Sequence, residues 1–231
     1  MGKTIELMNT GDGSHTLLNT EMNETYHSRH GALRESQHVF INKGLNHFID
    51  TYPKADTIDI FEMGLGTGLN LILTLQSALS FPNLHFNYTT LEAYPLEPEL
   101  LDQLNYLDFL KDDKLNALFK KMHQLNWNEW HEVLPNFRLK KVQQKLEDYQ
   151  QAEASIDLIY YDAFAPNKQA ELWTLETMRK ISNMLRPKGV LVTYCAKGQL
   201  KRDLKSLALT VETLEGPPGK AEMVRASKLS G

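Results

Sequence analysis

The ten-residue segment FEMGLGTGLN, residues 61–70, constrains the fold of this chain more than any other part of the sequence. Gly64, Gly66 and Gly68 occupy every second position, directly after an apolar run and before a stretch with helical spacing. Glycine tolerates positive φ and lets the backbone approach a ligand closely. A glycine-rich turn between a strand and a helix is where alternating α/β sheets bind cofactors. The segment therefore predicts a cofactor-binding turn in an α/β fold.

The segments on both sides of this turn alternate between strand-like and helix-like patterns. Strands are expected at 57–63, 85–92, 137–143, 155–164 and 189–195, and helices at 68–79, 170–185 and 198–207. This order predicts a mostly parallel sheet with right-handed crossovers. Two closing strand patterns, 209–215 and 221–227, are joined by GPPG, which predicts an antiparallel C-terminal strand.

Length and composition predict one core with two additions. A chain of 231 residues with 42% apolar residues can bury a single sizeable core. Residues 1–52 are expected to form an N-terminal extension, a hairpin around GDGS followed by a helix from Leu33 to Ile49. Residues 53–231 are expected to form the main domain. Within it, residues 97–131 are rich in Leu, Asp, Lys and Asn and predict a helical insertion.

Several functional classes are disfavoured by composition. No apolar run approaches membrane-spanning length and the N-terminus lacks a signal-peptide pattern, so a cytoplasmic protein without a membrane partner is expected. Cys195 is the single cysteine, which excludes an internal disulfide and a Cys-based zinc site. His27 and His30 are spaced H-x-x-H, but no flanking carboxylate completes a zinc pattern. No metal is expected.

The C-terminal fifth of the chain is basic. Residues 186–231 contain nine Lys or Arg residues against four Asp or Glu, although the whole chain has a formal charge of −4. Such a segment could face the phosphates of a nucleic acid. A solvated basic face is the alternative interpretation.

The spacing of the glycines separates two classes of cofactor. The dinucleotide fingerprint G-x-G-x-x-G would need a glycine at position 69, where this chain has Leu69. The E-x-G-x-G-x-G spacing from Glu62 to Gly68 instead resembles motif I of the class I S-adenosylmethionine (SAM) methyltransferases, which implies their Rossmann-like fold. The resemblance implies SAM contacts from Glu62, Gly64, Gly66, Thr67, Gly68, Asn70, Glu92 and Asp162.

Two of these acidic residues have distinct expected roles. Glu92 ends the second strand, and its two acceptor oxygens suit the vicinal hydroxyls of a ribose. Glu62 is expected to contact the methionine ammonium, directly or through water, or else to brace the glycine turn.

DAFAP, residues 162–166, follows the most strand-like run in the sequence. An amine that attacks a sulfonium methyl must be neutral and oriented, so it needs a hydrogen-bond acceptor. Asp162 is the candidate catalytic residue, while Phe164 could stack on a planar base and Pro166 could stiffen the loop. Cys195 raises an alternative reaction, in which a cysteine thiolate attacks a pyrimidine ring. Because Tyr194 and not proline precedes it, packing at a strand end is the preferred interpretation.

Several longer strings resemble one family. DGSHTL (12–17), YHSRHGALRESQHVF (26–40), DAFAPNKQAELWT (162–174) and GPPGKAEM (216–223), together with the glycine segment, are similar to the methyltransferase component of the bacterial MnmC family of tRNA wobble-uridine modification enzymes. The resemblance implies methyl transfer from SAM to the exocyclic amine of 5-aminomethyl-uridine, or its 2-thio form, at tRNA position 34. The tRNA anticodon stem-loop is then the partner. The expected substrate contacts are Phe164, Pro166, Lys197, Lys201, Arg202, Lys220 and Glu222, with Lys205 near the phosphates.

The chain also departs from the family pattern. Ala163 stands where the family has glycine, Ala221 where it has arginine, and Lys145 where an aspartate is expected to face adenine. Many members carry a fused FAD oxidase, for which this chain has no room, so the aminomethyl substrate is expected to be made elsewhere. Tyr26, Ser28 and Glu35 are expected near the cofactor without an assigned role, and Trp173 is expected to pack in the core.

Two other functions remain open at this point. One is small-molecule N-methylation or aminopropyl transfer on the same fold, although the aminopropyl-transferring enzymes favour G-G-G-x-G and Met63 and Leu65 do not match it. The other is a non-catalytic RNA-binding scaffold, which the acidic pair Glu92 and Asp162 argues against.

Overall fold

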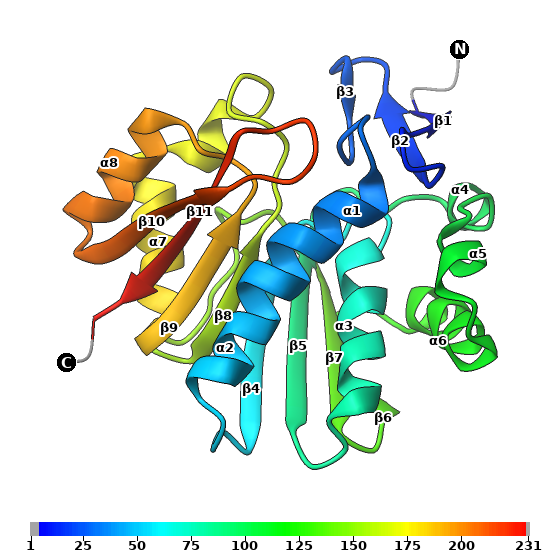
Figure 1. Ribbon diagram of the computed structural model, residues 1–231, viewed down its shortest axis with the longest axis horizontal. Helices are drawn as coiled ribbons and strands as arrows, with labels where there is room; N and C mark the ends of the chain where they lie inside the picture. The colour runs from blue at the N-terminus through cyan, green and yellow to red at the C-terminus, as the bar shows by residue number, and fades with distance from the viewer. Residues whose placement is uncertain (1–4, 230–231) are drawn as a thin grey trace.

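An eight-stranded sheet of order β10-β11-β9-β8-β4-β5-β7-β6 forms the centre of the molecule (Figure 1). The computed structural model describes residues 5–229. The strands are β4 (Thr57–Met63), β5 (His85–Glu92), β6 (Trp130–Leu134), β7 (Phe137–Gln143), β8 (Ile156–Tyr161), β9 (Leu185–Thr193), β10 (Leu209–Glu215) and β11 (Glu222–Lys228). β7, β5, β4, β8 and β9 run parallel, whereas β11 is antiparallel to both of its neighbours and β6 to β7. The mostly parallel sheet with an antiparallel C-terminal strand is confirmed.

Helices cover both faces of this sheet. One face carries a continuous helical rod made of α1 (Ala32–Ser36), the π-helical segment η1 (Gln37–Asn46) and α2 (His47–Thr51), together with α3 (Leu69–Ser80) and α6 (Asp113–Gln124). The other face carries α7 (Leu175–Met184) and α8 (Gly198–Ser206). Successive strand residues point to opposite faces, so Ile60 packs in the first core and Phe61 in the second. The strands are apolar on both sides because both faces are covered.

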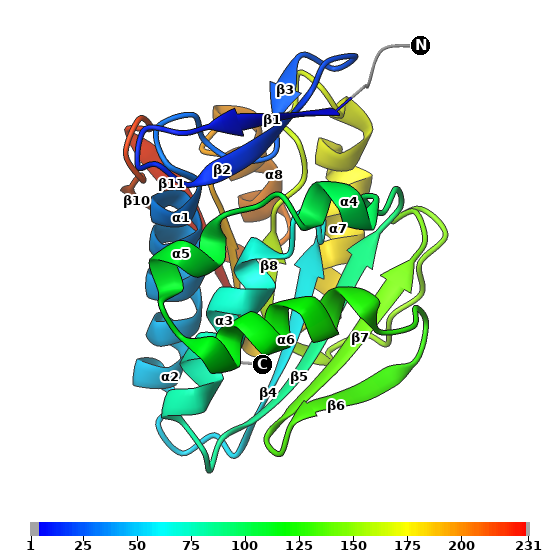
Figure 2. The same ribbon diagram turned by 90° about the vertical axis from the view of Figure 1, so that its right-hand side faces the viewer.

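A small antiparallel sheet lies above the carboxyl ends of the parallel strands (Figures 1 and 2). It consists of β1 (Ile5–Asn9), β2 (His15–Asn19) and β3 (Glu24–Thr25). The carboxylate of Asp12, in the turn between β1 and β2, accepts hydrogen bonds from the backbone N–H groups of Ser14 (3.0 Å) and Arg34 (3.1 Å). The hairpin is thereby attached to the first turn of α1.

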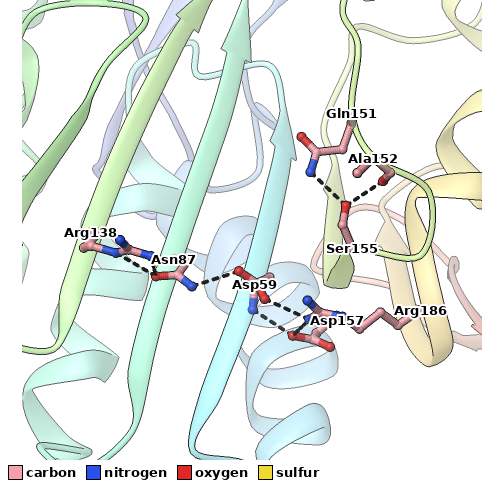
Figure 3. A network of polar contacts seen from close by, with 8 residues as sticks. All are labelled: Asp59, Asn87, Arg138, Gln151, Ala152, Ser155, Asp157 and Arg186. Carbon is pink, nitrogen blue, oxygen red and sulfur yellow. Dashed lines mark hydrogen bonds and ion pairs between the residues drawn. The ribbon is translucent and has the colours of Figure 1, made fainter.

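A row of polar side chains crosses the five parallel strands (Figure 3). Arg138 donates twice to Asn87 (3.0 and 2.9 Å), and Asn87 donates to Asp59 (2.9 Å). Arg186 then bridges Asp59 (2.8 Å) and Asp157 (2.6 Å). These residues lie near the amino ends of their strands, away from the glycine turn. The row adds side-chain contacts to the backbone pairing of neighbouring strands.

Most predicted elements are confirmed, and some have different bounds. Strands 57–63, 85–92, 137–143 and 209–215 have the predicted limits, and the predicted N-terminal hairpin and helix are present. The strand predicted at 155–164 was too long, because the chain leaves the sheet after Tyr161. The strand predicted at 189–195 begins earlier, at Leu185, and includes a bulge with Lys188 at φ 70°. Residues 1–4 of the predicted extension lie outside the described residues.

Two helical predictions need correction. The segment 170–185 is divided into the 3-10 turn η2 (Ala170–Trp173) and α7, because Thr174 caps α7 with its side chain, which accepts the N–H of Thr177 (3.2 Å). The segment 97–131 contains α4 (Pro98–Leu101), α5 (Tyr106–Leu110) and α6, but β6 begins at Trp130. This edge strand was not predicted because a bulge interrupts its alternation. None of the helices within residues 5–229 is long and apolar enough to cross a membrane.

Candidate active site

A cavity of about 770 Å³ opens at the carboxyl ends of β4, β5 and β8, beneath the small sheet. Its volume lies in the range of small-molecule sites in proteins. Open α/β sheets bind ligands at this edge. Of the predicted residues, the cavity wall brings together Gly64, Gly66, Asn70, Glu92, Asp162, Phe164 and Lys220.

The glycine turn packs closely against its neighbours. Gly64 and Gly66 have φ of 91° and 50°. A Cβ atom on Gly64 would lie 3.0 Å from the carbonyl oxygen of Asp162, and one on Gly66 would lie 3.2 Å from the ring of Tyr26. Both the backbone conformation and the close approach of β8 and Tyr26 therefore require glycine.

Thr67 and Gly68 do not line this cavity. Gly68, at φ 76°, faces Met122 and His123 of α6. The hydroxyl of Thr67 accepts a hydrogen bond from the buried hydroxyl of Tyr106 (3.0 Å). In this structure the two residues attach the turn to the helical insertion.

Glu92 is held in place by the backbone at the end of β5. Its Oε2 accepts the N–H of Gly66 (3.1 Å) and its Oε1 accepts the N–H of Tyr94 (2.9 Å). Each carboxylate oxygen retains further acceptor capacity. Lys145, which stands where the family resemblance leads us to expect an aspartate, also lies in the wall and forms an exposed ion pair with Glu147 (3.4 Å).

Asp162 follows β8 and lies in the cavity wall. Its Oδ2 accepts a hydrogen bond from the side-chain amide of Asn70 (2.8 Å). Burial, together with the negative charge of Glu35, raises the pKa of Asp162 to about 7, against the lowering effects of Asn70 and Lys220. A carboxyl group that titrates near neutral pH is suited to accept a proton or a hydrogen bond from an amine.

An ion pair forms another part of the wall. Lys220 donates to Oε1 of Glu35 (2.6 Å) and lies 3.7 Å from the ring centroid of Tyr194. Oε2 of Glu35 accepts the N–H of Ser28 (2.6 Å). Tyr194 was missed as a site residue. Its position at the end of a strand adjacent to β8 is the signal that could have indicated it.

Glu62 lies beneath the glycine turn, outside the cavity wall. It is fully buried, and the polar groups that face its carboxyl group belong to Thr90, Tyr88 and Asn70. Burial raises the pKa of Glu62 to about 8. This acid is therefore mostly protonated at neutral pH.

The loop after β8 carries an aromatic side chain toward the cavity. Phe164 lines the wall and packs edge-on against Tyr26, with ring centroids 4.9 Å apart. Its carbonyl oxygen accepts a hydrogen bond from Nε1 of Trp173 (2.7 Å), which is buried as predicted. Pro166 lies in the same loop but not in the cavity wall.

The predicted phosphate-binding residues lie outside the cavity. Lys201 forms an ion pair with Glu222 (2.7 Å), so these two predicted substrate contacts bind each other. Arg202 donates to Gln199 within α8 (2.8 Å), and Lys197 precedes that helix. Of the predicted basic residues, Lys220 is the one in the cavity wall.

The cysteine and histidines are engaged elsewhere. Cys195 is buried, which raises its pKa and disfavours a reactive thiolate. The backbone N–H of the buried His27 donates to Thr16, and the rings of His15 and His38 each bond a backbone carbonyl. Across the described part of the chain, no group of three or more His, Cys, Asp or Glu side chains is arranged to hold a metal ion.

Comparisons with known proteins agree with this geometry. The chain is 31% identical over 215 residues to the "tRNA 5-methylaminomethyl-2-thiouridine biosynthesis bifunctional protein MnmC" of Cupriavidus necator, covering 88% of this chain and 32% of that protein. The protein of the same name from Burkholderia thailandensis is 26% identical, covering 90% of this chain and 33% of that protein. The chain thus spans about a third of the length of these curated relatives.

A solved structure shares the fold. The crystal structure of MNMC2 from Aquifex aeolicus matches all of this chain and 72% of that chain with a TM-score of 0.78, at 23% sequence identity. The family model described as "S-adenosyl-L-methionine-dependent methyltransferase" matches residues 113–229, about half of the chain. The protein belongs to the family of S-adenosyl-L-methionine-dependent methyltransferases.

Proposed function

We propose that this protein transfers a methyl group from SAM to the exocyclic amine of 5-aminomethyl-uridine, or its 2-thio form, at wobble position 34 of tRNA. The observation that carries the proposal is that Asp162 and the glycine turn face one cavity. The tRNA substrate is supported by the printed names of the curated relatives, which concern 5-methylaminomethyl-2-thiouridine biosynthesis.

The residues of the cavity fit SAM. Asn70 lies in the cavity wall and uses its amide N–H to hold Asp162 in place. Glu92 offers a fixed carboxylate to a ribose diol. The positive φ of Gly64 and Gly66 lets the main chain pass close to the bound molecule. When bound, SAM supplies an electrophilic methyl group.

The chain's own residues prepare the amine. Asp162, in its carboxylate form, accepts a hydrogen bond from the substrate amine and orients its lone pair. Because the pKa of Asp162 is about 7, the same group can take the proton that the amine releases. Phe164 offers an aromatic face or edge to the uracil ring. A wobble base that has left the anticodon stack could reach this position.

The tRNA anticodon stem-loop is the proposed partner. Lys197 and Arg202 are exposed around the start of α8 and remain available to phosphates. Lys201 forms an ion pair with Glu222, so its charge attracts phosphates less strongly. A cytoplasmic location follows from this proposal, since tRNA modification takes place there in bacteria.

The direct test is methyl transfer. The purified protein is incubated with labelled SAM and tRNA from cells that lack the terminal wobble methylation, and the nucleosides are analysed for 5-methylaminomethyl-uridine. We expect label in that nucleoside and none in fully modified tRNA, the matched control. Transfer to small amines but not to tRNA would support the small-molecule alternative.

Two further assays separate the remaining alternatives. Product formation from putrescine and decarboxylated SAM would indicate an aminopropyl-transferring enzyme. Calorimetry with SAM tests whether the protein is a scaffold, because a protein that has lost the chemistry need not bind the cofactor. Absence of SAM binding would contradict the proposed function.

A further inference from the structure

A second cavity, of about 460 Å³, lies beside the candidate active site. It shares Leu65, Gly66 and Glu92 with the first cavity and is otherwise lined by the helical insertion, its flanking loops and β7. The proposed methyl transfer uses none of these other residues. Its apolar wall consists of Pro95, Leu96, Pro98, Leu101, Phe119 and Trp127.

The wall also contains a buried cation. Lys141 is 1% exposed, and its ammonium donates to the carbonyl oxygen of His123 (2.8 Å) and lies 4.7 Å from the ring centroid of Trp127. Among the described residues, no carboxylate forms an ion pair with it. Burial lowers the pKa of Lys141 to about 8, so the ammonium is largely charged at neutral pH. A buried charge without a counter-ion is costly, and a bound anion would remove that cost.

The other ionisable groups of this cavity do not neutralise Lys141. Asp102 and Lys120 are exposed at its rim. The carboxylate of Glu92 is engaged by the N–H groups of Gly66 and Tyr94. His123 has a buried Nε2 without a partner among residues 5–229, and burial lowers its pKa to about 4, so its ring is neutral.

We propose that this second cavity binds a small amphipathic anion, a molecule that joins a carboxylate, sulfonate or phosphate to a flat apolar body. The anionic group pairs with Lys141, and the apolar body packs against Trp127 and Phe119. Because most of the two linings are different, this ligand and SAM bind at the same time. The inference stands whether or not the methyl acceptor is tRNA.

The test uses two fluorescent probes that differ in one charge. 8-Anilinonaphthalene-1-sulfonate carries the anionic group, and N-phenyl-1-naphthylamine has the same ring system without it. Both are titrated into the 231-residue chain in saturating S-adenosylhomocysteine, which fills the candidate active site. We expect the sulfonate to bind to the wild-type protein. Lys141→Met should lower the affinity for the sulfonate about tenfold or more, because a charged hydrogen bond is lost. The neutral probe should bind both proteins equally.

Two more variants complete the design. Lys140→Met is the matched control, because the adjacent strand position points to the opposite face of β7 and should leave both affinities unchanged. Leu96→Trp fills the cavity and leaves the charge of Lys141 in place. It should weaken the binding of both probes. Replacement of a buried charge by Met usually leaves a protein folded, which a thermal melt verifies. Equal sulfonate affinity in Lys141→Met and wild type, or complete displacement of the sulfonate by S-adenosylhomocysteine, would overturn the proposal.

Discussion

At the scale of single residues, Asp162 is the side chain whose setting best matches the proposed chemistry. It is held by Asn70, lies in the cavity wall and has a pKa of about 7. Asp162→Ala removes the acceptor for the amine, so we expect turnover to fall about 100-fold or more. SAM affinity, measured by calorimetry, should change far less.

Asp162→Asn separates the two possible contributions of this side chain. Asparagine keeps an acceptor oxygen and the shape of the residue but cannot take a proton at neutral pH. If orientation dominates, Asp162→Asn retains more activity than Asp162→Ala, and if proton acceptance dominates, the two variants are equally slow. Wild-type turnover in Asp162→Ala would remove this residue from the mechanism.

Glu62 gives a prediction about stability and pH. Its pKa is raised to about 8 in the folded protein, above its ordinary value of 4.5, because the carboxyl group is buried. Between these values the folded state binds more protons than the unfolded state. The contribution of Glu62 to the free energy of unfolding is therefore fully present below pH 4.5. It is lost as the pH rises toward 8.

The measurement compares Glu62→Gln with wild type in urea denaturation at pH 5.5, 7.0 and 8.5. Glutamine cannot ionise, so the difference in unfolding free energy should shift in favour of the variant as the pH rises. The upper bound is about 1.4 kcal/mol for each pH unit within that window. Most other acids affect both proteins alike, whereas the charge of Asp162 contributes to the raised pKa of Glu62 and so acts in wild type alone. Parallel pH profiles would show that Glu62 does not titrate in this range.

At the scale of elements, one side chain fixes the connection between α3 and β5. Nδ2 of the buried Asn136 lies within hydrogen-bond distance of the carbonyl oxygens of Ala78 (3.1 Å), Phe81 (3.0 Å) and Leu84 (3.0 Å). Asn136→Ala leaves these acceptors without the donor, and we expect a loss of about 1–3 kcal/mol in urea denaturation. Asn83→Ala, an exposed asparagine in the same connection, is the control and should be nearly neutral. An unchanged midpoint for Asn136→Ala would indicate that water replaces the amide.

The elements around the glycine turn could be predicted because their signals are local. The apolar run of β4, the glycines and the strand pattern of β5 agree with one another, and their order gives the parallel sheet. The bulged edge strand β6 and the three carbonyl acceptors of Asn136 have no such local signal. Nor does the π-helical hydrogen bonding of η1, because side-chain spacing alone does not distinguish it from an α-helix.

In the candidate site, too, residues with a local sequence signal could be predicted and residues joined by long-range contacts could not. Glu92 ends one predicted strand and Asp162 lies in the last three residues of another, so their shared edge followed from sheet topology. The pair Lys220 and Glu35 joins residues 185 positions apart. A single sequence contains no periodic signal for such a contact, and Lys220 was named from the family resemblance alone. Tyr194, which lies under that ammonium, was missed although it follows a strand adjacent to β8.

At the scale of the whole molecule, the small sheet and the loop after β8 meet beside the cavity. The ammonium of Lys168 donates to the carbonyl oxygen of Met22 (2.8 Å), and the ring of Tyr26 packs against Phe164. These contacts join segments that are more than a hundred residues apart in the sequence. These two contacts therefore enclose one side of the cavity, while Leu17 of β2 anchors the small sheet in the first hydrophobic core.

Lys168→Met tests whether this contact controls access to the cavity. The hydrogen bond is partly exposed, so its loss should cost about 1 kcal/mol or less and raise the dissociation constant of SAM about twofold to fivefold. Hydrogen exchange in residues 19–25 should accelerate, while the melting temperature stays nearly constant because the cores are untouched. Lys54→Met, which removes an exposed lysine near the amino end of β4, is the control. It should change neither the dissociation constant of SAM nor hydrogen exchange in residues 19–25. Unchanged exchange in Lys168→Met would mean that the small sheet stays closed without this bond, whereas a large drop in melting temperature would assign Lys168 to folding instead of access.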